Sequence, residues 1–179
     1  MKATGIVRRI DDLGRVVIPK EIRRTMRIRE GDPLEIYTDR DGEVIFKKYS
    51  PIGELGEFAA QYAETLAKTS GCPVCITDKD NVIAVSGIPK KELHDKRISA
   101  DLERIMDEKT TFTMTGSSHK MSVADGSERY FAGVVAPIIS EGDSIGSVVM
   151  VSSEDNTQMG EVEEKLARSA AGFLGKQME

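Results

Sequence analysis

The chain has 179 residues, of which 39% are hydrophobic and 31% are charged, and its formal net charge at pH 7 is -5. This composition predicts one large folded domain or two small ones. No apolar stretch resembles a secretory signal or approaches the ~20 residues that span a bilayer, so we expect a cytoplasmic protein without membrane contact. Two cysteines do not suggest a scaffold built on disulfides.

The charge is unevenly divided along the chain. Residues 1–50 carry 12 Lys and Arg against 9 Asp and Glu, a net charge of +3, whereas the rest of the chain carries 13 against 21, a net charge of -8. This asymmetry indicates a basic binding module joined to an acidic domain.

The first fifty residues predict a β-β-α-β-β unit. Runs rich in β-branched residues indicate the strands, and apolar residues four apart indicate the helix. The expected elements are strands at 4–10 and 13–19, a helix at 20–28, and strands at 34–38 and 43–48. The Asp41-Gly42 pair predicts a tight hairpin between the last two strands. Because so small a unit buries little surface alone, we expect it to dimerise, with its strand edges as one route.

The remainder of the chain predicts a domain with a core of its own. Residues 51–54 are the expected linker, since Pro51 and Gly53 interrupt regular structure. Residues 55–179 then predict, in order, a helix, a strand hairpin, a helix, three strands and a helix. Ser99 is the expected N-cap of the middle helix. The first and last helices carry apolar residues three and four apart, a pattern that suits packing together or against a second copy.

Arginine is concentrated in residues 8–27. A guanidinium carries a permanent charge and a planar set of donors that matches phosphate oxygens and the O6/N7 edge of guanine. Several such groups on one small surface would neutralise several phosphates and release counterions. A solvated basic face is the alternative, and charge alone does not decide between the two. One short helix among strands does not fit a helix-turn-helix motif, which needs two consecutive helices.

The order of residues 1–49 closely resembles the DNA-binding domain of the AbrB family of bacterial transition-state regulators. The run TGIVRRIDDLGRVVIP, followed by EIRR and then by DPLEIY, carries the resemblance. It implies a swapped-hairpin dimer, in which two copies interleave their strands into one small β-barrel. It also implies DNA-contacting arginines at Arg8, Arg15, Arg23 and Arg24. We add their basic neighbours Lys2, Arg9, Lys20 and Arg27 from charge alone.

The resemblance extends along the chain and gives an α+β fold class. Residues 55–179 resemble a GAF domain, a small-molecule sensing fold with an antiparallel sheet, through the order of their elements. The whole chain is similar to sporulation regulators in which an AbrB-like head precedes such a domain. The resemblance implies a nucleoid-associated transcription regulator of the developing spore that binds double-stranded DNA with loose sequence preference, activating some genes and repressing others. Heads and tails that pair with different partners would give a tetramer.

The second segment offers no catalytic or metal-binding set. Cys72 and Cys75 form a C-x-x-C motif, but a hairpin follows it where a redox site would have a helix. His94 and His119 lack ligand spacing to the two cysteines. We therefore expect two ordinary reduced cysteines, no metal and no enzyme activity.

Two questions stay open at the level of sequence. The second domain either holds a pocket for an unidentified small-molecule effector, lined by residues from 73–86, 99–106 and 129–137, or serves structure alone. AbrB-like heads also occur in antitoxins, so the head could instead bind a partner protein. In antitoxins the following segment is usually short and disordered, whereas residues 55–179 are patterned to fold, which favours DNA binding.

Overall fold

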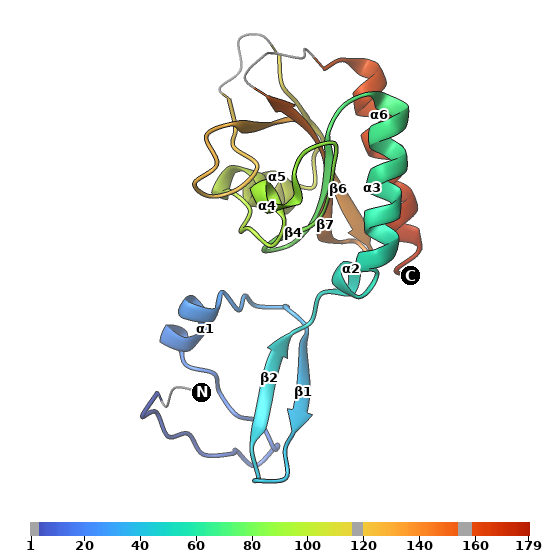
Figure 1. The fold of residues 1–179 in the computed structure, drawn as a ribbon. Coiled ribbons are helices and arrows are strands. Elements are labelled where there is room, and N and C mark those ends of the chain that lie inside the picture. Colours follow the sequence, from blue (N-terminus) through green and yellow to red (C-terminus); the bar gives the residue numbers. More distant parts are fainter. Residues whose placement is uncertain (1–3, 116–119, 154–158) are drawn as a thin grey trace. The chain divides into compact units, whose positions relative to one another are not determined.

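The computed structural model describes residues 4–115, 120–153 and 159–179. The chain divides into two compact units, Met1–Tyr49 and Ser50–Glu179, which we call the first and the second unit and describe separately (Figure 1). Both units combine helices with antiparallel strands, which confirms the predicted α+β class. Among the described residues, no helix is both long and apolar enough to cross a membrane.

One helix and one hairpin make up the regular structure of the first unit. Helix α1 (Lys20–Met26) begins after Pro19 and ends at Arg27, which adopts the left-handed conformation. Strands β1 (Leu34–Thr38) and β2 (Val44–Lys48) pair antiparallel, as the hairpin prediction requires. The helix and both strands were therefore predicted close to their observed positions.

The two strands predicted before the helix are absent from this single chain. Within the described residues, 4–19 contain a turn near residue 12 but no strand ladder, and the only sheet of the unit is the β1–β2 hairpin. A strand persists only where its N–H and C=O groups find partners. Nothing in one copy pairs with these segments, so the prediction of strands at 4–10 and 13–19 is wrong for the isolated chain.

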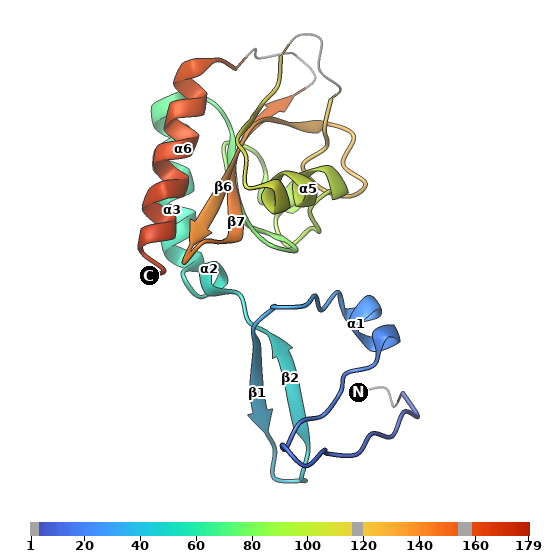
Figure 2. The same cartoon turned by 180° about the vertical axis from the view of Figure 1, so that it is seen from behind.

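The second unit is a five-stranded antiparallel sheet covered by helices on both faces (Figures 1 and 2). The strands lie in the order β4-β3-β7-β6-β5. They are β3 (Val74–Asp78), β4 (Val82–Ser86), β5 (Phe112–Thr113), β6 (Tyr130–Ser140) and β7 (Asp143–Ser153). The helices are α2 (Pro51–Glu54), α3 (Gly56–Ser70), α4 (Lys90–Leu93), α5 (Ala100–Glu108) and α6 (Glu161–Lys176).

Two separate cores lie on the two faces of this sheet. Along β3, Val74 and Ile76 face α3 and α6, while Cys75 faces α5, because successive side chains of a strand point to opposite sides. Leu102 and Ile105 of α5 fill the second core. Burial on both faces accounts for the continuous apolar runs of the central strands.

Serine side chains cap the N-terminal ends of two helices, α5 and α2. Ser99 Oγ accepts from the Leu102 N–H at 3.2 Å, which confirms the predicted cap of α5. The expected linker at 51–54 is instead the short helix α2, capped by Ser50. Ile52 of this helix is fully buried in the core of the second unit, so the segment is held in place and does not serve as an open connection.

Candidate nucleic-acid interface

The basic residues singled out by the sequence form two groups on the first unit. Arg8, Arg9 and Arg15 precede α1, whereas Lys20, Arg23, Arg24 and Arg27 lie on α1 or at its end. Arg23 and Arg27 are half-buried and the other five are exposed, while Lys2 lies outside the described residues. Five of the seven described residues of this set are therefore exposed to an anionic partner.

A turn at residues 11–15 precedes α1. The Asp11 N–H donates to the Arg15 carbonyl at 3.0 Å, and the Gly14 N–H donates to the Asp11 carbonyl at 3.0 Å. The Asp11 carboxylate closes the turn, because its Oδ1 accepts from the N–H groups of Leu13 at 3.0 Å and Arg15 at 2.8 Å. Gly14 has a φ of 76°, a left-handed conformation that glycine adopts without strain. The local sequence DDLGR thus specifies the turn.

The same carboxylate holds the Arg15 side chain. Asp11 Oδ2 accepts from Arg15 Nε at 2.8 Å, while the Arg15 side chain stays 67% exposed. Hydrogen bonds from the Arg15 backbone N–H, and then from its guanidinium, hold the pKa of Asp11 below its ordinary value. Asp11 was not among the residues predicted for the site, although an Asp three residues before a Gly is a turn signal that could have indicated it.

Helix α1 is tied to the hairpin at its C-terminal end. Lys48 Nζ, at the end of β2, donates to the Arg27 carbonyl at 2.9 Å and lies 3.9 Å from an oxygen of Asp32. The Asp32 side chain is almost completely buried. These contacts fix the last turn of the helix, where Arg23 and Arg24 lie.

Arg23 differs from the other arginines of the group in its surroundings. Its Nε is buried and has no hydrogen-bond partner among the described residues. A buried donor without an acceptor costs ~1–3 kcal/mol, so such groups are rare in stable folds. No described residue therefore supplies the acceptor that this position calls for.

Apolar side chains of the first unit lie largely in solvent. Of the 15 large apolar side chains that are exposed among the described residues, 13 belong to this unit: Ile6, Val7, Ile10, Leu13, Val16, Val17, Met26, Ile36, Tyr37, Val44, Ile45, Phe46 and Tyr49. Both clusters of buried apolar residues belong to the second unit. The first unit, taken alone, therefore has almost no core.

The hairpin shows where a core would form. Ile36 lies opposite Phe46 in the register of β1 and β2, and Thr38 lies opposite Val44. Since side chains alternate along a strand, these residues share one face with Leu34 and its partner Lys48, so four of the six side chains on that face are apolar. The other face pairs Glu35 with Lys47 and Tyr37 with Ile45. This face of the hairpin therefore exposes apolar side chains of the kind that folded proteins usually bury.

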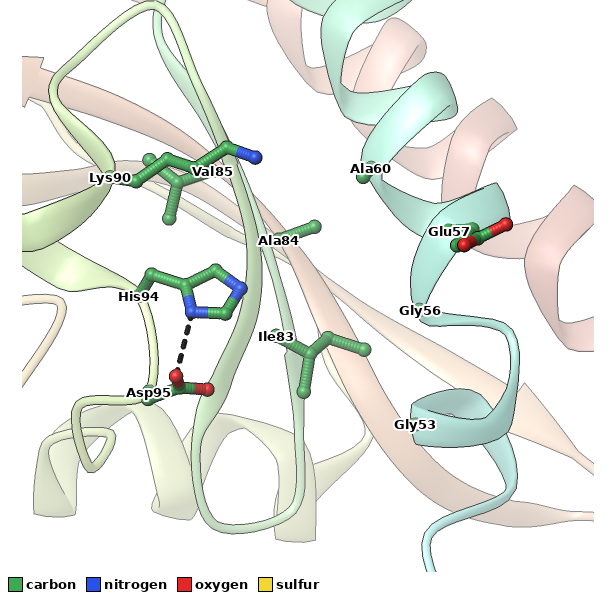
Figure 3. A pocket seen from close by; sticks show the side chains of 10 residues that line it. All are labelled: Gly53, Gly56, Glu57, Ala60, Ile83, Ala84, Val85, Lys90, His94 and Asp95. Atoms are coloured by element: carbon green, nitrogen blue, oxygen red, sulfur yellow. Dashed lines mark ion pairs between the residues drawn. The ribbon is translucent and has the colours of Figure 1, made fainter.

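The second unit has a groove between the start of α3, strand β4 and the α4 region, shown in Figure 3. Ile83, Ala84 and Val85 form its apolar floor. Its charged lining consists of Glu57, Lys90, His94 and Asp95. His94 Nδ1 lies 3.0 Å from Asp95 Oδ2 in an ion pair that requires a protonated imidazole.

The sequence predicts a pocket lined by residues from 73–86, 99–106 and 129–137. Cys75, Leu102 and Val135, one from each of these segments, are buried together in the core on the α5 face. The groove of Figure 3 takes Ile83, Ala84 and Val85 from the first of these segments, but its other lining residues come from 53–60 and 90–95 and not from 99–106 or 129–137.

The two cysteines are buried and not joined by a disulfide. Burial raises the pKa of the Cys75 thiol to about 12 and also raises the pKa of the Cys72 thiol. Thiols with raised pKa values are poor nucleophiles and poor metal ligands. The described residues contain no group of three or more His, Cys, Asp or Glu that could hold a metal ion, and His119 lies outside them.

Comparison with known proteins gives these features a common explanation. Residues 54–179 match the family model of the stage V sporulation protein T C-terminal domain, a transcription factor, and residues 7–53 match that of the bacterial antitoxin MazE, described as antidote-toxin recognition. Stage V sporulation protein T of Bacillus subtilis is 58% identical over 179 residues, which is 100% of this chain and 99% of that protein. The transition state regulatory protein AbrB of Bacillus subtilis is 65% identical over 51 residues, 28% of this chain and 52% of AbrB.

The second unit also has a relative of known structure. The GAF domain of a phosphoenolpyruvate-protein phosphotransferase from Coxiella burnetii superposes with a TM-score of 0.53 at 16% identity, over 69% of this chain and 82% of that one. At this identity the likeness shows the fold alone. The fold and the matches together define the class as a transcription regulator with an AbrB-like head and a GAF-like tail, as predicted. The chain belongs to the stage V sporulation protein T family.

Proposed function

We propose that the protein regulates sporulation genes by binding double-stranded DNA as a dimer, with residues 1–50 as the binding and dimerisation module. The observation that carries this proposal is the coexistence, on one small unit, of exposed arginines and an uncovered apolar surface. The regulator activates some genes and represses others, and acts at the nucleoid in the cytoplasm of the developing spore.

The apolar surface supports the dimer. Covering one large apolar side chain stabilises a fold by ~1.5–3 kcal/mol, and 13 such side chains are exposed in the first unit. A second copy would also supply pairing partners for 4–19 and an acceptor near the buried Nε of Arg23. A swapped-hairpin barrel, in which the two copies interleave, meets all three needs.

The arginines supply the DNA contacts. We assign Arg8, Arg15, Arg23 and Arg24 to the primary set and Lys2, Arg9, Lys20 and Arg27 to the surrounding basic surface. A dimer doubles each contact about a two-fold axis, as a duplex allows. Contacts directed mainly at phosphates carry little sequence information, which accounts for a loose sequence preference.

A salt titration of DNA binding by the full chain tests this assignment. Replacing Arg8, Arg15, Arg23 or Arg24 by Ala should weaken binding, and loss of a phosphate contact should reduce the salt slope by about 1 per contact. R40A is the matched control, because it removes one exposed positive charge from the same unit outside the proposed set. Unchanged affinity in all four variants, with fold and dimer intact, would reject DNA binding through this surface.

A second candidate is protein binding of the antitoxin type. The match of residues 7–53 to the antitoxin model favours it, since such heads also act through a partner protein. The same variants separate the two functions. An antitoxin-type head would retain its partner when the phosphate contacts are removed, whereas a DNA-binding head would lose its ligand.

The second unit adds two finer proposals. Rings of Phe58, Tyr62 and Phe173 cluster on α3 and α6, with centroids 5.6–6.3 Å apart, and we assign this surface to tetramer formation. A single species of dimer mass across micromolar concentrations in light scattering would exclude the tetramer.

We place a small-molecule effector site in the groove of Figure 3. A thermal-shift screen of metabolites tests this site on the native protein and on K90A. The site is excluded if no metabolite stabilises the native protein more than it stabilises K90A.

A further inference from the structure

We infer that Asp11, in spite of its negative charge, promotes DNA binding by holding the Arg15 guanidinium in place. This inference rests on the proposed function and adds a positioning residue to it. An acidic side chain beside a DNA contact would ordinarily repel phosphate. The geometry of the turn indicates the opposite effect for this one.

Each oxygen of the carboxylate has a distinct task. Oδ1 accepts from the N–H groups of Leu13 and Arg15, at 3.0 and 2.8 Å, and so shapes the turn. Oδ2 accepts from Arg15 Nε, at 2.8 Å, and so orients the side chain. The backbone and the side chain of Arg15 are therefore fixed by one neighbour four residues earlier.

The contact occupies the inner edge of the guanidinium alone. Arginine has five N–H donors, and the Nε–H is the one bound to Asp11. No described residue engages the two terminal nitrogens, and the side chain is 67% exposed. Those nitrogens are the pair that can bind a phosphate or a guanine edge in bidentate fashion.

Fixing the side chain before binding lowers the cost of binding. A free arginine loses much rotamer freedom when it is ordered at an interface, and an arginine that is already ordered loses less. An exposed ion pair of this kind adds little to the stability of the fold itself. The contact is therefore explained better by the position it gives Arg15 than by stability.

Asp12 provides a matched control. It is the next residue, it is exposed, and no hydrogen bond or ion pair joins its carboxylate to another described residue. D12N and D11N remove the same charge from neighbouring positions. If charge alone mattered, both substitutions would strengthen DNA binding. If Asp11 positions Arg15, D11N weakens binding and D12N does not.

The test measures binding of a mixed-sequence duplex by full-length D11N, D12N, R15A and D11N/R15A at several salt concentrations. Asparagine keeps an oxygen for the two N–H groups but presents a donor to Arg15 Nε, so the turn is retained while the side chain is released. D11S, whose hydroxyl can also accept in the turn, is the second variant should D11N fail to fold. We expect D11N to weaken binding about 5-fold with an unchanged salt slope, D12N to bind as tightly as native or more tightly, and D11N to add nothing to R15A.

Three results would overturn the inference. The first is that D11N binds as tightly as D12N. The second is that D11N weakens the R15A variant as much as it weakens the native chain. The third is that R15A binds DNA normally. In each of these cases the proposed function survives if R8A and R24A still weaken binding. Loss of effect in all the arginine variants rejects both the proposed function and the inference.

Discussion

The two units differ most in where their apolar side chains lie. In Ser50–Glu179 they fill two cores on the two faces of a sheet, and single residues such as Leu102 are fully buried. In the first unit they are exposed on the segment before α1 and on both faces of the hairpin, and no large apolar residue among 4–49 is buried. The second unit completes its fold with one chain. The first unit has the composition of a folded protein but has almost no core in one chain.

A matched pair of substitutions tests this difference most severely. Ile36 in the first unit is 60% exposed and Val162 in the second is 66% exposed. If only one chain is considered, both positions should tolerate a polar substitution equally well. We expect I36D to abolish DNA binding, a loss of at least ~100-fold, because a charge in the apolar face would prevent the dimer core from forming. V162D should leave affinity for a short duplex within about threefold of native.

Binding by anisotropy and molar mass by light scattering report on both variants. I36D should also lose the contact between heads, whereas V162D should at most reduce the assembly from tetramer to dimer. Native affinity in I36D would show that this face is not covered, and would remove the main support for the dimer.

The core of the second unit should respond in the usual way to truncation. Leu102 on α5 is fully buried, so L102A should lower the free energy of unfolding by ~2–5 kcal/mol. V162A, at an exposed position, should change it by less than about 0.5 kcal/mol. Chemical denaturation monitored by circular dichroism measures both. A small effect of L102A would mean that the α5 face is loosely packed.

The accuracy of the predictions from sequence also differs between the two units. Residues 55–179 were predicted nearly element by element, because alternation, helical periodicity and the Ser99 cap are local signals that one chain satisfies. The strands at 4–10 and 13–19 were predicted from equally local signals, but these segments pair with no strand among the described residues of one chain. The other walls of the groove in Figure 3 were not predicted, because periodicity does not show which elements leave space between them. Local sequence could have shown Asp11 closing the turn, but its contact with Arg15 Nε required coordinates.

Thiol reactivity gives an independent measure of how well the core on the α5 face excludes solvent and reagents. Burial raises the pKa of Cys75 to about 12, so its thiolate is scarce at pH 8 and its side chain is inaccessible. Alkylation of Cys75 in the native protein should be at least ~100-fold slower than in the protein unfolded in guanidinium. Mass spectrometry after iodoacetamide treatment distinguishes Cys75 from Cys72. Rapid labelling of native Cys75 would contradict the closed α5 face.

The smallest effect concerns a carboxylate that resembles Asp11 in its contacts and differs in its role. Glu163 Oε2 accepts from the Gly160 N–H at 2.8 Å at the start of α6, and this N–H holds the pKa of Glu163 below its ordinary value. E163Q should lower the free energy of unfolding by ~0.5 kcal/mol at pH 7, since the contact is exposed. E161Q is the control, because Glu161 lies in the same turn and makes a surface ion pair with Lys165.

The pH dependence of this effect has a defined sign. A carboxyl group whose pKa is lower in the folded state stabilises the fold above its unfolded pKa, and this contribution disappears as the pH falls through the folded value. The difference between native protein and E163Q should therefore be constant near neutral pH and shrink below about pH 4. DNA binding should not change in E163Q, whereas D11N should change DNA binding and hardly affect stability. A difference that is constant over the whole pH range would show that Glu163 acts through packing, and a loss of DNA binding in E163Q would show that the two units do not keep these roles apart.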